Sequence, residues 1–159
     1  MALPTQTEYL ANLAALQGIS GATSAAGLTT EDMVAIAATK VEVCIPIGTE
    51  ATALTAATRL ASLRLPFAFT LTGVRMSLGV TSSSGIPTVD INKNGSTVLS
   101  TKLTVDVGEL TSTTAAAPAV LTTTTGVAFA ADDEITLDGD VAGTSTAGVK
   151  VWLIGRRTS

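Results

Sequence analysis

LRLPFAFTLTGVRMSLGV, residues 63–80, is the stretch that decides the fold of this chain. Its large apolar residues occupy odd positions before Thr72-Gly73 and even positions after it, namely Leu63, Leu65, Phe67, Phe69 and Leu71, then Val74, Met76, Leu78 and Val80. Alternation with period two predicts β-strand. A one-residue change of parity beside a glycine predicts a bulge, which bends a strand while its apolar face stays on the core. Pro66 is a candidate break in the first half.

A β-hairpin is predicted next, in TVDINKNGSTVLS at residues 88–100. Asn94-Gly95 is typical of a type I′ turn, in which both central residues adopt positive φ. A two-residue turn places Ile91 opposite Val98, so both side chains are expected in the core.

Shorter alternating runs extend the β pattern on both sides of these stretches. Their apolar residues are Val41, Val43, Ile45 and Ile47; Leu103, Val105 and Val107; Ile135, Leu137 and Val141; and Val149, Val151 and Leu153. Pro46 favours a sheet edge for the first run, and residues 108–126 indicate a long loop with one short strand near Val120. Roughly seven or eight strands with frequent turn signals predict a mainly β fold, an antiparallel β-sandwich of which the jelly roll is one form.

Residues 1–39 have a helical pattern instead, and we expect two short α-helices there. Thr5 and Glu8 form a capping box before the first helix, and Thr29 caps the second. The apolar stripes are Tyr9, Leu10, Leu13 and Leu16 in the first helix and Met33 and Ile36 in the second. Helices of about three turns are marginal alone in water. The sequence therefore predicts an N-terminal helical attachment segment, 1–39, followed by a β-sandwich domain, 40–159.

Composition excludes several classes of function. The chain has no histidine and one cysteine, which removes the commonest general base, Cys-based zinc sites and an internal disulfide framework. A net charge of -4 with nine Lys and Arg disfavours nucleic acid as a partner. We expect no membrane span, because no apolar run reaches about 18 residues, and no signal peptide. Mean hydropathy of +0.47 with only 14% charged residues predicts association with copies of itself or with a partner.

An acidic cluster is the main candidate for ligand chemistry. It comprises Asp132, Asp133, Glu134, Asp138 and Asp140. Alternating carboxylates could hold Ca²⁺ through oxygen ligands, although the spacing matches no EF-hand loop. The alternative is a solvated strand face that keeps the sheet from pairing edge to edge, and this interpretation is favoured. A glycosidase would need facing carboxylates across a cleft, which a flat strand face does not offer.

Three other features have competing interpretations. Trp152 alternates with apolar residues, which favours packing at an inter-subunit or helix–sheet contact over stacking on a sugar. Arg156 and Arg157 could reach an acidic partner surface or could simply be a solubilising tail. Cys44, within an apolar alternating strand, is expected to be a buried and inert thiol.

The chain from about Val41 to Arg157 resembles a β-sandwich module of tailed-bacteriophage structural proteins. The resemblance is carried by LPFAFTLTGVRMSLGVTSSSG (65–85), TVDINKNGSTVLSTKLTVD (88–106), DDEITLDGD (132–140) and GTSTAGVKVWLIGRR (143–157). Such modules occur on capsid decoration proteins and on fibres. The resemblance therefore implies a virion protein, and it supplies no catalytic motif, cofactor or metal site.

The resulting prediction is a non-enzymatic virion protein that decorates or cements a phage capsid, as a homotrimer. It would be synthesised in the host cytoplasm and lie on the capsid surface, with the major capsid protein or another virion protein as its partner. The expected capsid or inter-subunit contacts are Tyr9, Leu10, Leu13, Leu16, Met33, Ile36, Trp152, Arg156 and Arg157. The alternative is a head- or tail-fibre module that recognises a host surface glycan, which would need a concave site with exposed aromatic side chains.

Overall fold

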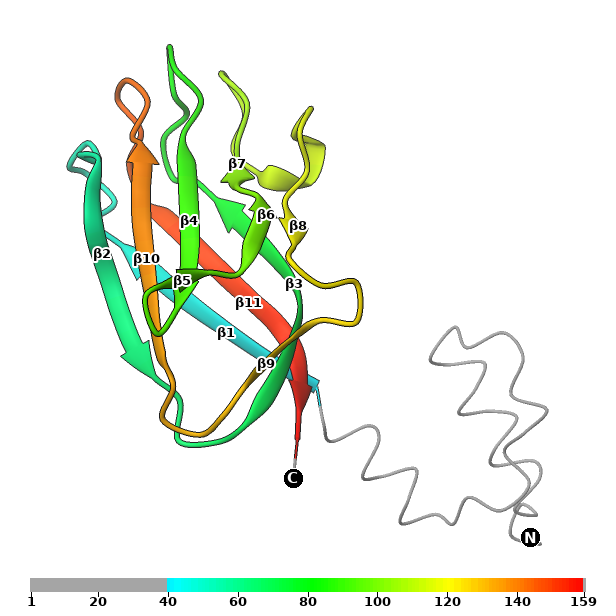
Figure 1. Cartoon of the computed structure of the whole chain (residues 1–159). Helices are drawn as coiled ribbons and strands as arrows, with labels where there is room; N and C mark the ends of the chain where they lie inside the picture. The colour runs from blue at the N-terminus through cyan, green and yellow to red at the C-terminus, as the bar shows by residue number, and fades with distance from the viewer. Residues whose placement is uncertain (1–39, 159) are drawn as a thin grey trace, which may run out of the picture. The chain divides into compact units, whose positions relative to one another are not determined.

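The structure is a computed structural model that describes residues 40–158 (Figure 1). Both predicted N-terminal helices, and the contact residues Tyr9 to Ile36, lie outside the described residues. The described chain is mainly β. Its elements are β1 (Lys40–Ile47), β2 (Ala57–Arg64), β3 (Phe69–Ser77), β4 (Thr88–Lys93), β5 (Ser96–Thr97), β6 (Leu99–Thr101), β7 (Leu103–Thr104), the 3₁₀ helix η2 (Ser112–Thr114), β8 (Val120–Leu121), β9 (Val127–Phe129), β10 (Glu134–Val141) and β11 (Val149–Arg157).

Two antiparallel sheets contain most of these strands. The first sheet has the order β1-β11-β3-β9, and the second has the order β2-β10-β4-β5, with β7 also paired to β4. Strands β6 and β8 form a separate two-stranded sheet. Figure 1 shows the second sheet stacked in front of the first. Strands β1 to β4 alternate between the sheets, so each connection crosses from one layer to the other.

One hydrophobic core lies between the sheets, because each strand turns alternate residues inward. Its fully buried side chains are mostly aliphatic: Phe69, Ile47, Leu71, Met76, Ile91, Leu103, Ile135, Leu137, Leu153, Val89, Val105 and Val149. Burying one such side chain contributes about 1.5–3 kcal/mol. The rings of Phe69 and Phe129 stack at 4.8 Å in this core. With few aromatic residues in the chain, aliphatic side chains therefore fill most of the core.

The predicted bulge is confirmed at Thr72. Ile154 of β11 is in register with Gly73, whereas the next residue, Gly155, is in register with Leu71. Thr72 is therefore the extra residue on β3. The predicted break at Pro66 is also confirmed, because β2 ends at Arg64 and β3 begins at Phe69 in the other sheet.

The hairpin has the predicted turn. Asn94 and Gly95 have φ of 48° and 83°. The Val98 amide donates to the Ile91 carbonyl at 2.9 Å, and both side chains are buried. Asn94 also donates from its side-chain amide to Asp133 Oδ1 at 2.8 Å. The turn is thereby fastened to the connection between β9 and β10.

The sheet-edge position predicted from Pro46 is confirmed, since β1 pairs only with β11. The interpretation of Cys44 as a buried thiol is wrong, because its side chain is exposed. Cys44 shares the outward parity of Glu42 and Pro46, while Ile45 and Ile47 point inward. An apolar strand at the edge of a sheet still has one face in solvent.

The strand count differs from the expectation. The described residues contain eleven strands, and several have only two or three residues, too few to give a period-two signal. Strand β9, at 127–129, was not predicted for that reason. Val80, Val107 and Val141 were expected on inward strand faces but are exposed. Strand β3 ends at Ser77, β7 ends at Thr104, and the β10 register shifts before Val141.

Candidate interaction surface

The outer face of the first sheet carries the side chains with the clearest potential for binding. Glu42, Cys44, Arg75, Trp152, Ile154 and Arg156 point outward from β1, β3 and β11, and we call this set the Trp152 face. Cys44, Trp152 and Arg75 are register partners in one row across the three strands. The bulge at Thr72 is what turns Arg75 outward beside Trp152.

A depression of about 210 Å³ lies on this face, lined by Glu42, Arg75, Trp152 and Ile154. Trp152 is 38% exposed, although it is large and apolar. Another depression, of about 250 Å³, lies beside β3 and is lined by Thr72, Gly73, Val74, Ala119, Val120, Leu121, Thr123 and Thr124. Both volumes are below the roughly 300–1,000 Å³ of small-molecule sites. Each can take a protein side chain rather than a drug-sized ligand.

The Trp152 face differs from the remainder of residues 40–158 in that two of its arginines, Arg75 and Arg156, have no ion-pair partner there. Ion pairs within this range engage Lys40, Arg59, Arg64, Lys93, Lys102 and Lys150. Arg75, Arg156 and Arg157 have no such partner there. Arg157 lies over the Phe67 ring, with Cζ 5.0 Å from the ring centroid. Guanidinium groups without a carboxylate partner therefore gather on β3 and β11, in a protein whose net charge is -4.

The acidic cluster does not converge on a common point. Four of its five carboxylates are engaged by nearby donors, and the Asp132 carboxylate has no hydrogen-bond or ion-pair partner among residues 40–158. Asp133 accepts from the Asn94 side chain and from the Ala130 amide at 2.7 Å, and it pairs with Lys93 at 3.1 Å. These hydrogen bonds, that of Asn94 first, hold the pKa of Asp133 below its ordinary value. Arg59 pairs with Glu134 at 2.5 Å, and its hydrogen bond lowers the pKa of that carboxyl in turn.

The carboxylates of Asp138 and Asp140 also have hydrogen-bond or ion-pair partners. Asp138 accepts from the Asn92 side chain at 3.0 Å and from the Arg59 amide at 2.7 Å. Lys102 pairs with Asp140 and, at 3.2 Å, with the buried Asp90. The hydrogen bond to Asp140, followed by that to Asp90, raises the pKa of Lys102. Nowhere in 40–158 do three or more His, Cys, Asp or Glu side chains form a group that could hold a metal ion.

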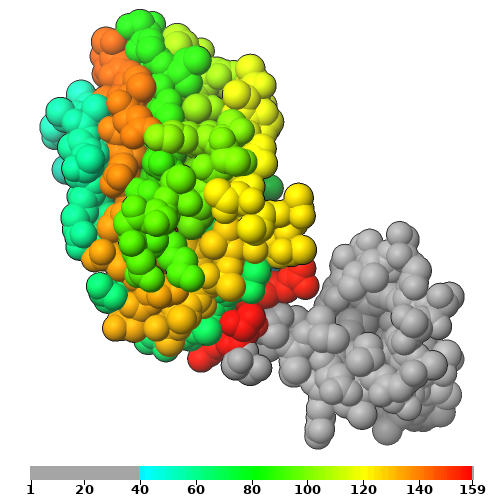
Figure 2. Space-filling view, in the orientation of Figure 1, coloured from blue at the N-terminus to red at the C-terminus, as the bar shows by residue number. Residues whose placement is uncertain are grey.

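The alternative interpretation, a solvated strand face that protects a sheet edge, is wrong about the edge, although Asp140 is exposed. Strand β10 lies inside the second sheet, between β2 and β4. Its carboxylates instead belong to a polar layer in which neighbouring donors satisfy them. Figure 2 shows this side of the molecule, with β10 between β2 and β4. The carboxylates of β10 are engaged by these neighbouring donors rather than gathered around one point.

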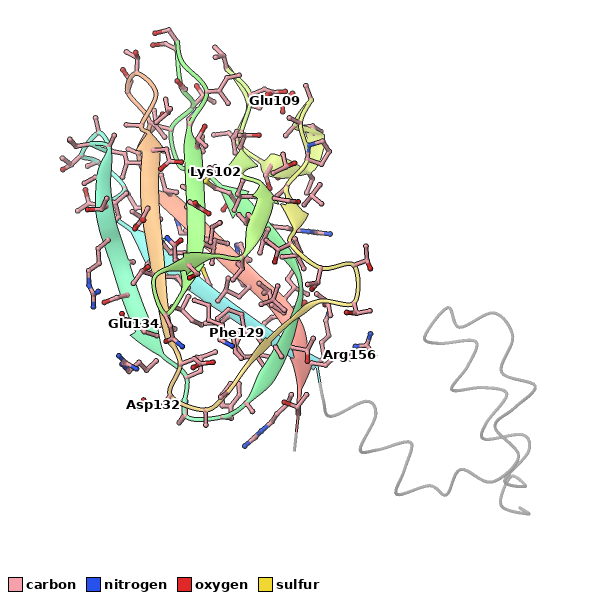
Figure 3. The ribbon with its side chains drawn as sticks, viewed as in Figure 1. Lys102, Glu109, Phe129, Asp132, Glu134 and Arg156 are labelled. Atoms are coloured by element: carbon pink, nitrogen blue, oxygen red, sulfur yellow. The ribbon has the colours of Figure 1, made fainter. Side chains whose placement is uncertain are left out.

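Loops at one end of the sheets carry most of the exposed large apolar side chains. Five of them lie there: Val80, Ile86, Val107, Leu110 and Val141. Hydrogen bonds join the loops, from the Gly108 amide to the Ser82 carbonyl at 3.0 Å and from the Thr144 amide to the Ser84 carbonyl at 2.8 Å. Figure 3 shows Glu109 at this end and Arg156 at the opposite end. Sequence reasoning missed this cluster, because its members come from two separate loops and from the end of β10.

Of the predicted contact residues, Trp152 and Arg156 share the outer face of β11, four residues apart. Arg157 points to Phe67 instead and does not join them. Sequence reasoning missed the other four members of the face, Glu42, Cys44, Arg75 and Ile154. For Arg75, the parity change at Thr72-Gly73 could have placed the side chain outward.

Comparison of the chain with protein-family models and with curated proteins gives no match. Within the part of the chain that the structure describes, no helix has the length and apolarity needed to cross a membrane. The described residues thus define a mainly β protein of antiparallel sheets with a Trp- and Arg-bearing outer face.

Proposed function

We propose that this protein is a non-enzymatic structural component of a tailed-bacteriophage virion, which decorates or cements the capsid surface as a homotrimer. The resemblance of residues 41–157 to phage β-sandwich modules motivates the proposal. The partners are the major capsid protein or another virion protein, and copies of the chain itself. Attachment is assigned to residues 1–39, with Arg156 and Arg157 as cationic contacts.

The strand pairing is the observation that carries this proposal. Strand β1 pairs with β11, β2 with β10, β3 with β9 and β4 with β5, so the pairs are nested along the chain. Nested pairs arise when one long antiparallel hairpin wraps around itself, which is the arrangement of a jelly roll. Jelly rolls build viral capsid proteins and also lectins and cupins. The pairing therefore supports a jelly-roll module, an architecture that virion proteins use.

The glycan-binding alternative is less favoured by the geometry. It needs a concave site with several exposed aromatic side chains, whereas Trp152 is the one large aromatic that is exposed among residues 40–158. The depression beside it is smaller than a typical small-molecule site. A single exposed ring beside a small depression is better suited to a protein surface.

Copy number in purified virions tests the proposal. Quantitative mass spectrometry of intact particles of the phage that encodes the chain should give a number of the same order as the major capsid protein. Electron microscopy of labelled particles should place the label over the whole head. A low copy number with label on the tail would support the fibre alternative, and absence from the particle would contradict both.

A truncated chain that begins at Lys40 tests the assignment of attachment. The described core runs from Ile45 to Leu153, so we expect this chain to keep a β-type circular dichroism spectrum and a cooperative melt. It should fail to bind particles that lack the protein, whereas the full chain should bind them. Aggregation or unfolding of the truncated chain would show that residues 1–39 belong to the core.

A further inference from the structure

The Trp152 face has the composition of a protein-binding surface. Trp and Arg are enriched among the residues that dominate binding free energies, and an unpaired guanidinium suits a carboxylate partner. Arg75 lies beside Trp152 in the same row, and both line the depression of about 210 Å³. Glu42 also lines the depression, but its carboxylate pairs with Lys40 at 2.7 Å and leaves Arg75 without an ion pair among residues 40–158. The surface therefore fits a partner that presents a carboxylate next to an apolar side chain.

The turn at residues 106–110, Asp-Val-Gly-Glu-Leu, has this complementary chemistry. Val107 and Leu110 are 47% and 49% exposed. Asp106 and Glu109 have no cationic partner within the described range, and loops 48–56, 78–87, 105–118 and 142–148 contain no Lys or Arg. The turn is thus acidic and apolar, and it lies at the end of the sheets opposite Arg156 (Figure 3).

This turn is held in a fixed shape. The Glu109 amide donates to the Asp106 carbonyl at 3.0 Å, and Gly108 at the third turn position has φ of 83°. The Leu78 amide, just after β3, donates to the Leu110 carbonyl at 2.9 Å. A surface that is already ordered loses little conformational entropy when it binds.

We propose that the 106–110 turn of one copy docks on the Trp152 face of a second copy. Glu109 would pair with Arg75 of its neighbour, and Leu110 would enter the depression beside Trp152. Two different patches meet in this contact, so it is heterologous. Repeating it around one symmetry axis builds a closed ring of copies when the rotation between neighbours divides a full turn evenly. Face-to-face docking of two Trp152 faces is disfavoured, because it would bring unpaired arginines together. The inference rests on the proposed self-assembly and identifies its interface.

Charge reversal at the two positions tests this contact in the full-length protein. Arg75→Glu and Glu109→Arg should each raise the dissociation constant of the oligomer about 30-fold or more, as measured by sedimentation. The double variant Arg75→Glu/Glu109→Arg should restore assembly, because the pair is re-formed with opposite signs. Arg64→Glu on β2 controls for the change of charge and should leave assembly unchanged; because Arg64 pairs with Glu134 at 3.7 Å, its fold is checked by circular dichroism first.

The wild-type chain supplies a second measurement. Cys44, its single cysteine, is the register partner of Trp152, its single tryptophan. Cys44 should react slowly with a maleimide in the oligomer and rapidly in Arg75→Glu, and Trp152 emission should shift to longer wavelength in that variant.

The possible results distinguish failure of the proposed interface from failure of the proposed self-assembly. An oligomer that persists in Arg75→Glu, or that leaves Cys44 fully reactive, would overturn the interface and leave self-assembly standing. A double variant that stays dissociated would overturn the Arg75–Glu109 pairing. A wild-type chain that sediments only as a monomer at low micromolar concentration would overturn both the interface and the proposed trimer.

Discussion

Gly155→Ala is expected to be among the most damaging single-methyl additions to the β-domain. Gly155 lies on β11 opposite the bulge of β3. A Cβ atom at this position would lie far inside van der Waals contact with the Thr70 carbonyl oxygen, and at 3.0 Å and 3.2 Å from the Thr70 carbonyl carbon and the Leu71 Cα. All three atoms belong to the backbone, which cannot rotate away as a side chain would.

The loss of folding free energy in Gly155→Ala depends on which part of the backbone must move. Relief of the contact requires β3 and β11 to separate at the bulge, in the middle of the first sheet. Overpacking of this kind costs about 1–3 kcal/mol, and more where the backbone is the neighbour. We therefore expect a loss of about 3 kcal/mol, which corresponds to a fall in Tm of about 12 °C for a domain of this size.

Gly73→Ala is the matched control, because Gly73 lies on β3 beside the same bulge. A Cβ atom there would meet no atom within 4 Å. Glycine in a strand is unfavourable by about 0.5–1 kcal/mol relative to alanine, so this variant should be neutral or slightly stabilised.

Urea and thermal unfolding of both variants, followed by circular dichroism and Trp152 fluorescence at one protein concentration, would measure the difference. Concentration must match because oligomer formation adds to the apparent stability. The account of the bulge is wrong if the free energy of unfolding of Gly155→Ala lies within about 0.5 kcal/mol of the wild-type value. It is also wrong if Gly73→Ala is the less stable of the two variants.

Two further predictions concern the hairpin and its surroundings. Gly95→Val should lower the free energy of unfolding by about 1–2 kcal/mol, because φ of 83° is strained for a residue with a Cβ, whereas Ser96→Val in the adjacent strand should be nearly neutral; equal effects in urea titrations would contradict the type I′ turn. Because the folded pKa values of Asp133 and Glu134 are lowered, their contribution to stability is fully present above their unfolded pKa values and is lost as the pH falls through the lower folded values. Urea midpoints should therefore fall below about pH 4, with a smaller fall in Asp133→Asn, and an unchanged acid dependence in that variant would refute the role of Asp133.

Local signals explain what the sequence could predict. The parity change at Thr72-Gly73 indicated the bulge, and Asn94-Gly95 indicated the turn, because backbone sterics and the alternation of side chains act over a few residues. The long alternating runs indicated most of the main strands and most of the inward-facing residues for the same reason. Strand β2 is the exception, because the predicted run began only at Leu63 and ATRLAS, residues 57–62, does not alternate. The two helices expected in residues 1–39 stay a prediction, and so does the attachment role assigned to that segment.

Only the tertiary structure decided which partners those local elements meet. The sequence directed attention to Gly73 at the bulge, but the glycine without room for a side chain is Gly155, some 80 residues away on another strand. The carboxylates near β10 looked like a cluster in the sequence, yet Arg59 and Lys102 divide them between separate pairs. Such contacts are set by strand order and register, which depend on how distant segments fill one core, and a local pattern carries no information about that choice. The same is true of Arg75, whose place beside Trp152 and lack of an ion pair among residues 40–158 appear only when β3 and β11 are paired.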